Sequence, residues 1–518
     1  METSPFRPKP DDPNLVPGSM VPEMTNTLSD EPRHDALGDE LRHDDLELHR
    51  QANARRHSGL LDKALADLPD LSQALEAMKR SSRDKLYNAV FDPLLKVMSG
   101  YFCVPDFSEK QRARQDTLTY CGTHWTAIAH QEVLDWVRTA LRRIGLQEDQ
   151  VRKHDFVLNL TRDLLFNLSK AFTPKTIAGG ALLNLQNGTL CIRPEDGGTF
   201  NIRLEPHRRD DFLTYVLPYA YDPQATCPLW DTFLRQVLPD PDAQRTLGEY
   251  MAYCFTPSVK AEKMLMLYGS GSNGKSVVLD VAEHILGTEN VSNIALSSLT
   301  QDPESRAHIE GRLLNISTES NRDLDSAMFK ALVSNEPVQI RVLYHGTRVM
   351  RTYARLMAAA NVLPMAENSD AFFRRFIILP FGCVISEEQA DTKLAEKLRG
   401  ELPGILNWVL ATLPAFIARG KFETGTTARE ALAQYRHDAD SVAQWLDERT
   451  RPSSVPTGGQ LLYNDYKAFC IDIGRKPVRR SAFYEQLMNK GKKRSIYHNH
   501  VTFEVALSSD SQPPAVSG

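Results

Sequence analysis

The order of apolar and polar positions predicts an α/β core between residues 256 and 385. The apolar run 264–268 precedes a glycine-rich stretch, and apolar residues at helical spacing then continue to Gly287. A short unbroken apolar run is typical of a strand that is buried on both faces, whereas the later spacing is typical of a helix. Further apolar runs within 312–319, 355–361 and 376–381 predict additional strands of the same sheet.

The pattern changes on both sides of this core and predicts a chain of several domains. An Asn187-Gly188 dipeptide between two alternating apolar runs predicts a β-hairpin in the domain before the core. The segments that we expect are a disordered start at 1–55, a helical segment at 56–95, a mixed α/β domain at 96–255, an ATPase core at 256–385, a helical linker at 386–436, a small domain at 437–508 and a tail at 509–518.

Composition narrows the class of protein. The net charge is −5, so any contact with nucleic acid must come from local basic patches. The seven cysteines include no Cys-x-x-Cys pair, which disfavours a zinc site and a disulfide framework and favours reduced thiols. We expect no membrane-spanning stretch and no signal peptide, and therefore a cytoplasmic protein that does not contact a membrane.

The glycine-rich stretch GSGSNGKS has the pattern of a phosphate-binding P-loop between a strand and a helix. Its glycines allow backbone N–H groups to surround a phosphate, and the helix N-terminus adds partial positive charge. Lys275 is expected to contact the β- and γ-phosphates, and the Ser276 hydroxyl is expected to hold Mg²⁺. The predicted ATP-binding residues are Gly269, Ser270, Gly271, Ser272, Asn273, Gly274, Lys275 and Ser276.

Polar residues follow the later apolar runs at the positions where a parallel sheet binds ligands. Glu319, Asn361 and the pair Arg374-Arg375 adjoin three predicted strands. The carboxyl ends of such strands meet at one edge, where ligands bind. Glu319 is expected to polarise the attacking water or to hold Mg²⁺, and Asn361 to bind that water or the γ-phosphate. One of the two arginines is expected to neutralise charge on the transferring phosphoryl group.

These motifs, in this order, resemble those of the superfamily 3 helicases, and within them the phage and plasmid-type primase-helicases. The resemblance covers about residues 180–385. Besides the P-loop, it includes LLNLQNGTL, RTLGEYMAYCFTP at 245–257, ISTE at 316–319, FKALVSNEPVQIRVLYHG at 329–346, AANVLP at 359–364 and DAFFRRFIILPF at 370–381.

The resemblance implies roles for single residues and an AAA+-like P-loop core. It implies that Lys275 and Ser276 bind ATP and Mg²⁺, that Glu319 is the acid of the second ATPase motif and that Asn361 is the sensor asparagine. Arg375, or its neighbour Arg374, resembles the arginine finger that enters the next subunit's site. The chain departs from the family by carrying Ser317-Thr318 where many P-loop ATPases have an Asp, and Asn335-Glu336 where Gly-Asp is frequent.

The segment Gln339–Met350 resembles the family's hairpin that binds DNA in the central channel of a ring. Its apolar and polar residues alternate around His345-Gly346, as expected of a hairpin. The alternative is an ordinary exposed hairpin. Basic and aromatic residues here provide positive charge and a surface on which bases can stack. The residues predicted to contact single-stranded DNA are Lys330, Arg341, Tyr344, His345 and Arg348.

Residues 461–508 predict two helices, a basic turn and a basic hairpin, which is the order of a winged helix-turn-helix. Eight Lys or Arg residues lie between 475 and 494, against the single acid Glu485. Such a patch is typical of a contact with duplex phosphates, and the alternative is a module that binds a protein. The predicted contacts are Arg479, Arg480, Lys492, Lys493 and Arg494.

These observations together predict an ATP-dependent DNA helicase of a phage, satellite or plasmid, acting as a ring, expected to be a hexamer, in the cytoplasm of a bacterial host. One alternative is a bifunctional primase-helicase, which is disfavoured because only about 100 residues remain for a primase domain and they lack a clear acidic cluster. The other alternative is an ATP-switched origin-binding protein that does not unwind DNA.

Overall fold

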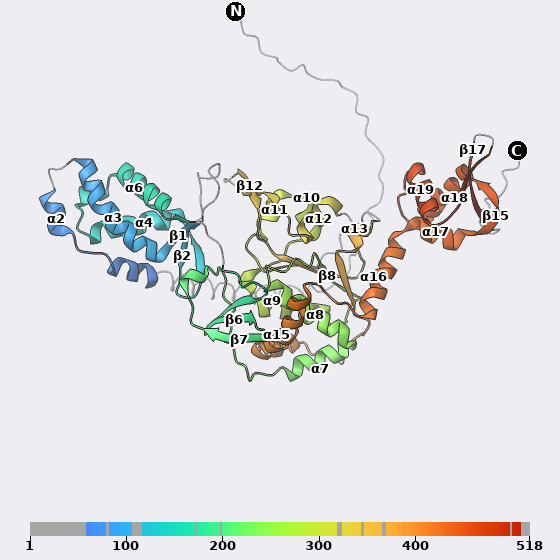
Figure 1. The fold of residues 1–518 in the computed structure, drawn as a ribbon, viewed down its shortest axis with the longest axis horizontal. Coiled ribbons are helices and arrows are strands. Elements are labelled where there is room, and N and C mark those ends of the chain that lie inside the picture. Colours follow the sequence, from blue (N-terminus) through green and yellow to red (C-terminus); the bar gives the residue numbers. More distant parts are fainter. Residues whose placement is uncertain are drawn as a thin grey trace, which may run out of the picture. The chain divides into compact units, whose positions relative to one another are not determined.

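The computed structural model describes residues 59–78, 82–105, 117–170, 175–196, 199–318, 324–342, 346–364, 369–386, 388, 390–497 and 500–508. The predicted disordered segment 1–55 and the predicted tail 509–518 lie outside these ranges. Figure 1 shows the parts of the chain in sequence order, coloured from blue at the N-terminal end to red at the C-terminal end.

The first part is a helical domain with a small four-stranded sheet of order β3-β2-β1-β4. Its core contains apolar residues from Ala64 to Leu168, so the predicted helical segment 56–95 and the start of the next predicted domain share one core. The elements are α2 (Ser72–Ala77), α3 (Arg83–Tyr101), β1 (Phe102–Pro105), β2 (Thr117–Tyr120), β3 (Trp125–Ile128), α4 (His130–Arg143), α5 (Glu148–Val151), α6 (His154–Asn167) and β4 (Ser169–Lys170).

A three-stranded antiparallel sheet and two helices precede the P-loop. The predicted hairpin is confirmed, because β5 and β6 pair antiparallel with Leu185 opposite Gly188. The elements are β5 (Ala181–Leu185), β6 (Gly188–Pro194), β7 (Phe200–Glu205), α7 (Pro228–Val237) and α8 (Pro241–Cys254).

A five-stranded parallel sheet follows, in the order β14-β8-β13-β10-β9. Strand β13 therefore lies between β8, which precedes the P-loop, and β10. The elements of this region are β8 (Met264–Tyr268), α9 (Lys275–Leu286), β9 (Val291–Ser292), α10 (Leu296–Gln301), α11 (Pro303–Ala307), β10 (Leu314–Ser317), α12 (Ser326–Val333), β11 (Val338–Val342), β12 (Gly346–Met350), β13 (Arg355–Ala360), α13 (Asp370–Phe373) and β14 (Phe376–Pro380).

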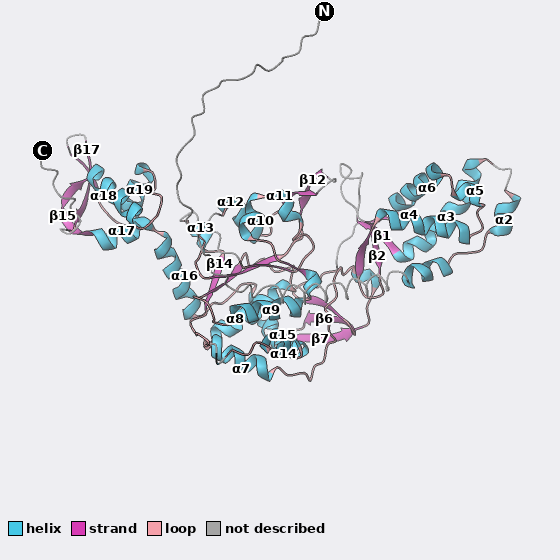
Figure 2. Ribbon diagram, turned by 180° about the vertical axis from the view of Figure 1, so that it is seen from behind, coloured by secondary structure: helices cyan, strands magenta, loops and turns pink. Residues whose placement is uncertain are grey.

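Both faces of this sheet are buried, which explains why β8, β13 and β14 are largely apolar, whereas β10 also buries the polar residues Asn315 and Ser317. Alternate residues of β8 belong to different cores: Leu265 and Leu267 pack with α8, α9 and the helix Leu402–Arg419, whereas Met264 and Met266 pack with α10 and α12. Figure 2 shows the same two helical layers on either side of the sheet. The sheet is thus a rigid support for the residues at its carboxyl edge.

Three helices follow the sheet: α14 (Leu394–Arg399), α15 (Leu402–Arg419) and α16 (Thr426–Ala439). By length and composition α15 could cross a membrane, although no such stretch was expected from the sequence. Its apolar residues, among them Ile405, Leu406 and Val409, are buried in the core that also contains β8 and α9. This burial accounts for the apolar composition of α15.

The core that contains β8 and α9 extends across two of the predicted domain boundaries. It joins β5, β6, α7 and α8 to the sheet and to α15, so it extends from Ala181 to Ala428. The predicted boundaries at 255 and 385 therefore both fall within one packed unit. The sequence motifs place the boundaries there because the residues expected to bind ATP lie between them, whereas packing continues through the helices on either side.

The C-terminal part is a small domain with its own core around Trp445, Tyr466 and Phe483. Both helices and the hairpin predicted from the sequence are present, and β15 completes an antiparallel sheet of order β15-β17-β16. The elements are α17 (Ser441–Arg449), β15 (Thr450–Gly458), α18 (Gly459–Asp472), α19 (Arg480–Asn489), β16 (Arg494–Tyr497) and β17 (His500–Leu507).

Candidate nucleotide-binding site

The glycine-rich loop connects β8 to α9 in a conformation that its glycines make possible. Gly271 and Gly274 have φ angles of 120° and 83°, in the left-handed region that favours glycine. A Cβ atom on Gly274 would lie 2.9 Å from Val237 and 3.0 Å from Phe233, both on α7. The loop therefore depends on glycine for its backbone conformation and also for its close packing against α7.

Lys275 is the first residue of α9 and is only 8% exposed. Its Nζ atom donates to the carbonyl oxygen of Gly269 at 2.8 Å and to Oδ1 of Asn273 at 2.9 Å. Burial lowers the pKa of the Lys275 ammonium from its usual value. Two oxygen atoms of the loop thus surround the cation in the way that phosphate oxygens would, which fits the residue to a triphosphate.

Asn273 links the loop to the end of a neighbouring strand. Its Nδ2 atom donates to the carbonyl oxygen of Phe381, which directly follows β14, at 3.0 Å, while its Oδ1 accepts from Lys275. The sequence predicted Asn273 only as one member of the loop. Its bridging role is not visible in the motif, because it depends on a carbonyl group more than 100 residues away.

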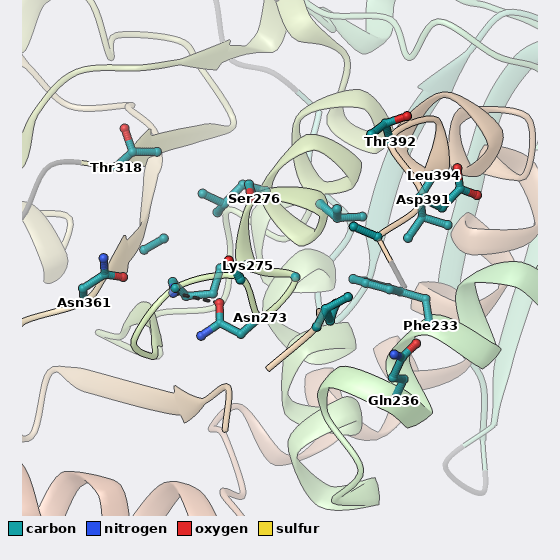
Figure 3. A pocket seen from close by; sticks show the side chains of 18 of the residues that line it. Phe233, Gln236, Asn273, Lys275, Ser276, Thr318, Asn361, Asp391, Thr392 and Leu394 are labelled. Carbon is teal, nitrogen blue, oxygen red and sulfur yellow. Dashed lines mark hydrogen bonds between the residues drawn. The ribbon is translucent and has the colours of Figure 1, made fainter. Parts of the chain in front are cut away.

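The loop lines a cavity of about 670 Å³, and the other residues that line this cavity come from distant parts of the chain. Figure 3 shows Asn361, at the end of β13, and Thr318, at the end of β10, on one side of Lys275. The strand order explains this, since β13 lies between β8 and β10. The predicted meeting of the P-loop and Asn361 is therefore present, and Ser276 also lines the cavity.

Glu319, the predicted acid, lies outside the described residues, and its preceding neighbour Thr318 is described. Thr318 lines the cavity directly after β10, so the chain leaves the strand at the edge where the loop and Asn361 lie. The role predicted for Glu319 stays a prediction.

The opposite side of the cavity was not anticipated from the sequence. It is formed by residues of α7 and of the segment before α14, on the far side of Lys275 from Asn361 (Figure 3). The backbone N–H of Ile385 donates to the carbonyl oxygen of Ser272 at 2.7 Å, and Arg399 of α14 forms an ion pair with Asp280 of α9 at 2.8 Å. These bonds attach this wall to the loop and to the helix that follows it.

The wall has an apolar part and a polar part. A surface of this kind suits a flat, partly polar ring such as a nucleobase. No local motif marks these residues, because they come from helices on both sides of the P-loop core. Its members include Leu229, Thr232, Phe233, Gln236, Ile385, Asp391, Thr392 and Leu394.

Arg374 and Arg375, which the sequence could not distinguish, differ in their exposure and in their hydrogen bonds. Arg375 is buried, and its guanidinium donates to the Ser334 hydroxyl at 2.8 Å and to the carbonyl oxygen of Ala371. Arg374 is exposed. A side chain that enters a neighbouring subunit must be accessible, so Arg374 fits this role better than Arg375, which is hydrogen-bonded within its own chain.

The predicted DNA hairpin is formed by β11 and β12, which pair antiparallel from Val338–Met350 to Val342–Gly346. Tyr344 and His345 lie outside the described residues, between β11 and β12 in the sequence. Arg341 is exposed and lies 3.4 Å from Glu304, whereas Arg348 is paired with Glu310 at 2.8 Å and is only 25% exposed. Lys330 lies on α12, in the segment just before the hairpin.

The basic residues of the C-terminal domain differ in how they are paired. Lys493 lies 3.1 Å from Glu504, and Lys490 is paired with Asp440. Arg480 donates to the side-chain oxygen of Gln460, which carries no charge. Within the described part of the chain, Arg479, Lys492 and Arg494 show no acidic partner. The patch is therefore less positive than the number of its own cations indicates.

Among the described residues, no group of three or more His, Cys, Asp or Glu side chains could hold a metal ion. At the P-loop, the side chain of Ser276 lines the cavity next to Lys275. The hydroxyl oxygen of Ser276 is suited to bind a Mg²⁺ ion that also binds phosphates.

Two family models match the chain. A model described as "D5 N terminal like" matches residues 109–239, and a model described as "Family of unknown function (DUF5906)" matches residues 267–375. The first match ends between α7 and α8, and the second begins within β8, just before the P-loop, and ends at Arg375. The chain thus carries a D5 N-terminal-like region before its P-loop.

Several proteins of large DNA viruses are similar to this chain. "Putative primase C962R" of African swine fever virus is 21% identical over 253 residues, which are 46% of this chain and 26% of the relative. "Putative helicase 022R" of Frog virus 3 is 25% identical over 254 residues, 43% of this chain and 26% of the relative. "Putative helicase L207/L206" of Acanthamoeba polyphaga mimivirus is 20% identical over 270 residues. The match thus spans about a quarter of these relatives' length.

A solved structure of the NrS-1 C-terminal region (305–718) is also similar, with 11% identity and a TM-score of 0.41 over 80% of this chain and 98% of that one. At this level the similarity supports no conclusion about function. By sequence, the chain is homologous to viral proteins whose names are "Putative primase" and "Putative helicase".

Proposed function

We propose that this protein is an ATP-dependent DNA helicase of a phage, satellite or plasmid replication system, acting in the cytoplasm of a bacterial host. One observation carries the proposal: Lys275 is held among loop oxygens in a cavity that Asn361 and Thr318 also line. The names of the viral relatives support a role in DNA replication, as a primase, a helicase or both.

In this proposal the triphosphate of ATP takes the place of the loop oxygens that now surround Lys275. The ammonium then faces the β- and γ-phosphates, and the backbone N–H groups of the loop and of the start of α9 face the other oxygens. Asn273 releases Lys275 and keeps its bond to Phe381. Asn361 orients the attacking water or the γ-phosphate from the end of β13.

Mg²⁺ would be held by Ser276 and by Glu319, and it would neutralise charge on the phosphates. Glu319 directly follows Thr318 in the sequence and is expected to polarise the attacking water. The wall around Phe233 and Leu394 holds the base and the sugar. This arrangement leaves the phosphate end facing Asn361.

The protein acts in this proposal as a ring, with a hexamer expected, in which each site is completed by the next subunit. Arg374 is the residue that enters the neighbouring site, because it is exposed and adjoins β14. Such an arginine stabilises charge on the transferring phosphoryl group. The β11–β12 hairpin contacts one strand in the channel, and the C-terminal domain, as a winged helix, contacts the duplex.

Two alternatives make different products from the same substrates. A primase-helicase would synthesise primers from nucleoside triphosphates on a single-stranded template, besides releasing a strand. An ATP-switched origin-binding protein would bind DNA and ATP and would release no strand. The full chain, a forked duplex with one labelled strand and ATP distinguish the three. The proposal predicts strand release that needs hydrolysable ATP, without primer synthesis.

A further inference from the structure

The segment 299–312, which we call the hairpin mount, is bonded to both strands of the β11–β12 hairpin. Arg306 is buried, and its Nε atom donates to the carbonyl oxygen of Gln339 on β11 at 3.1 Å. On β12, Arg348 donates from Nη1 to Oε1 of Glu310 at 2.8 Å and from Nη2 to the second oxygen of the same carboxylate. One arginine therefore links the mount to each strand: Arg306 of the mount bonds β11, and Arg348 of β12 bonds the mount.

The mount also joins the hairpin to the strands that end at the nucleotide cavity. Backbone bonds run from the N–H of Ala354 to the carbonyl of Ile309 at 3.0 Å and from the N–H of Gly311 to the carbonyl of Thr352 at 3.1 Å. The chain then enters β10 at Leu314 and β13 at Arg355, which pair with each other. The mount thus adjoins the amino ends of these two strands, and their carboxyl ends lead to the cavity.

The two ion pairs of the hairpin differ in strength. In the Arg348–Glu310 pair the side chains are 25% and 27% exposed, and each of the two terminal guanidinium nitrogens donates to a different carboxylate oxygen. In the Arg341–Glu304 pair the distance is 3.4 Å and the exposures are 64% and 48%. A bidentate, partly desolvated pair fixes its partners more firmly than an exposed single contact does. Arg341 can therefore leave its acid for a phosphate at little cost, whereas Arg348 cannot.

We infer that Arg348 is a positioning residue rather than a DNA contact, and that its pair with Glu310 transmits movement between the DNA hairpin and the nucleotide cavity. This replaces the role that the sequence predicted for Arg348, and it rests on the proposed function, since it needs a hairpin that contacts DNA. Within that function, Glu310 supports the response to DNA by holding the hairpin through Arg348, even though DNA repels its charge.

The substitution Glu310→Gln separates the two roles by the sign of its effect. If Arg348 contacts DNA, removal of the neighbouring acid frees the arginine and strengthens binding of single-stranded DNA. If Arg348 positions the hairpin, the same change loosens it and reduces the stimulation of ATP hydrolysis by DNA on the order of tenfold. We expect the second result, with ATP hydrolysis in the absence of DNA unchanged. The measurement uses the full chain and a single-stranded oligonucleotide.

Glu304→Gln is the matched control, because it removes the same charge from the same segment but only from the loose pair. It should leave the stimulation intact. Arg348→Lys keeps the charge and loses the bidentate geometry, so it should lower the stimulation as well, whereas a simple phosphate contact would tolerate it. Exchanging the two charges, in Glu310→Arg with Arg348→Glu, should restore much of the loss.

Three outcomes overturn the inference: Glu310→Gln tightens DNA binding, Arg348→Lys has no effect on stimulation, or the exchanged pair stays as impaired as Arg348→Glu alone. If Glu310→Gln fails to fold, the Arg348→Lys variant and the exchanged pair still decide the question. Failure of the proposed function looks different, because DNA would then not stimulate hydrolysis by the unaltered chain, and Arg341→Ala would not weaken binding of the oligonucleotide.

Discussion

The nucleotide cavity and the C-terminal domain both rely on lysine and arginine, but they hold these residues in different ways. In the cavity, Lys275 is buried and bonded to two oxygens of its own loop. In the C-terminal domain the cations are on the surface, and Lys490 and Lys493 are paired with acids from other segments. A cation fixed by a backbone motif can be assigned from the sequence alone. The number of cations in a surface patch overstates how many are available to a partner, because acids distant in the sequence neutralise some of them.

The largest expected effect is that of Lys275→Ala. Removing the cation at the phosphates should lower ATP hydrolysis by roughly 10³-fold or more, since electrostatic stabilisation inside a closed site is strong. Folding should persist, because the lost bonds go to the loop itself. Hydrolysis rates and melting curves with and without ATP measure both effects.

Lys260→Ala is the control for that experiment, because Lys260 is an exposed lysine shortly before β8. It should hydrolyse ATP at the normal rate. A folded Lys275→Ala protein that remains active would contradict the assignment of the cavity.

The second effect concerns Arg374. If it enters the neighbouring site, Arg374→Ala should reduce hydrolysis by about 10³-fold, as removal of such an arginine does in related reactions. Mixing Arg374→Ala with Lys275→Ala subunits should restore part of the activity, because some interfaces then carry both intact residues. Mixtures that assemble but stay inactive would count against a shared site.

Arg375→Ala should act on stability instead. Its guanidinium is buried against the Ser334 hydroxyl and the Ala371 carbonyl, so its removal leaves polar groups without partners. We expect a loss of about 2 kcal/mol in the free energy of unfolding, measured by denaturant titration. Full stability of Arg375→Ala, together with rescue in mixtures with Lys275→Ala, would return the trans role to Arg375.

The smallest effects belong to the C-terminal domain. Arg479 and Arg494 have no acidic partner among the described residues. Replacing either one with alanine should flatten the dependence of duplex affinity on salt by about 0.9 in log–log slope. Lys490→Ala should leave the slope nearly unchanged, because Asp440 already neutralises this lysine. If all three variants keep the slope of the unaltered chain, the patch binds a protein rather than duplex phosphates.

The parts of the fold that could be predicted from the sequence are those that local patterns determine. The apolar runs predicted the strands, since a strand that is buried on both faces is mostly apolar, and the dipeptide Asn187-Gly188 predicted its hairpin. The P-loop, Ser276 and Asn361 meet in one cavity because the strand order brings their strands together.

The remaining features depend on contacts between distant segments, which a single sequence does not reveal. The wall formed by Phe233 and Leu394 comes from helices on both sides of the P-loop core. The difference between Arg374 and Arg375 follows from one hydroxyl group, that of Ser334, which faces only the second. The role of Arg348 changes because Glu310, 38 residues away, accepts its hydrogen bonds.

The central claim is that ATP hydrolysis in the Lys275 cavity drives the separation of DNA strands. The most direct test follows release of a labelled strand from a forked duplex by the full chain and by Lys275→Ala. The account predicts release with ATP, no release with a non-hydrolysable analogue, and none by the variant, although both proteins bind the fork. Binding of ATP and the fork without release of a strand by the unaltered chain would contradict it.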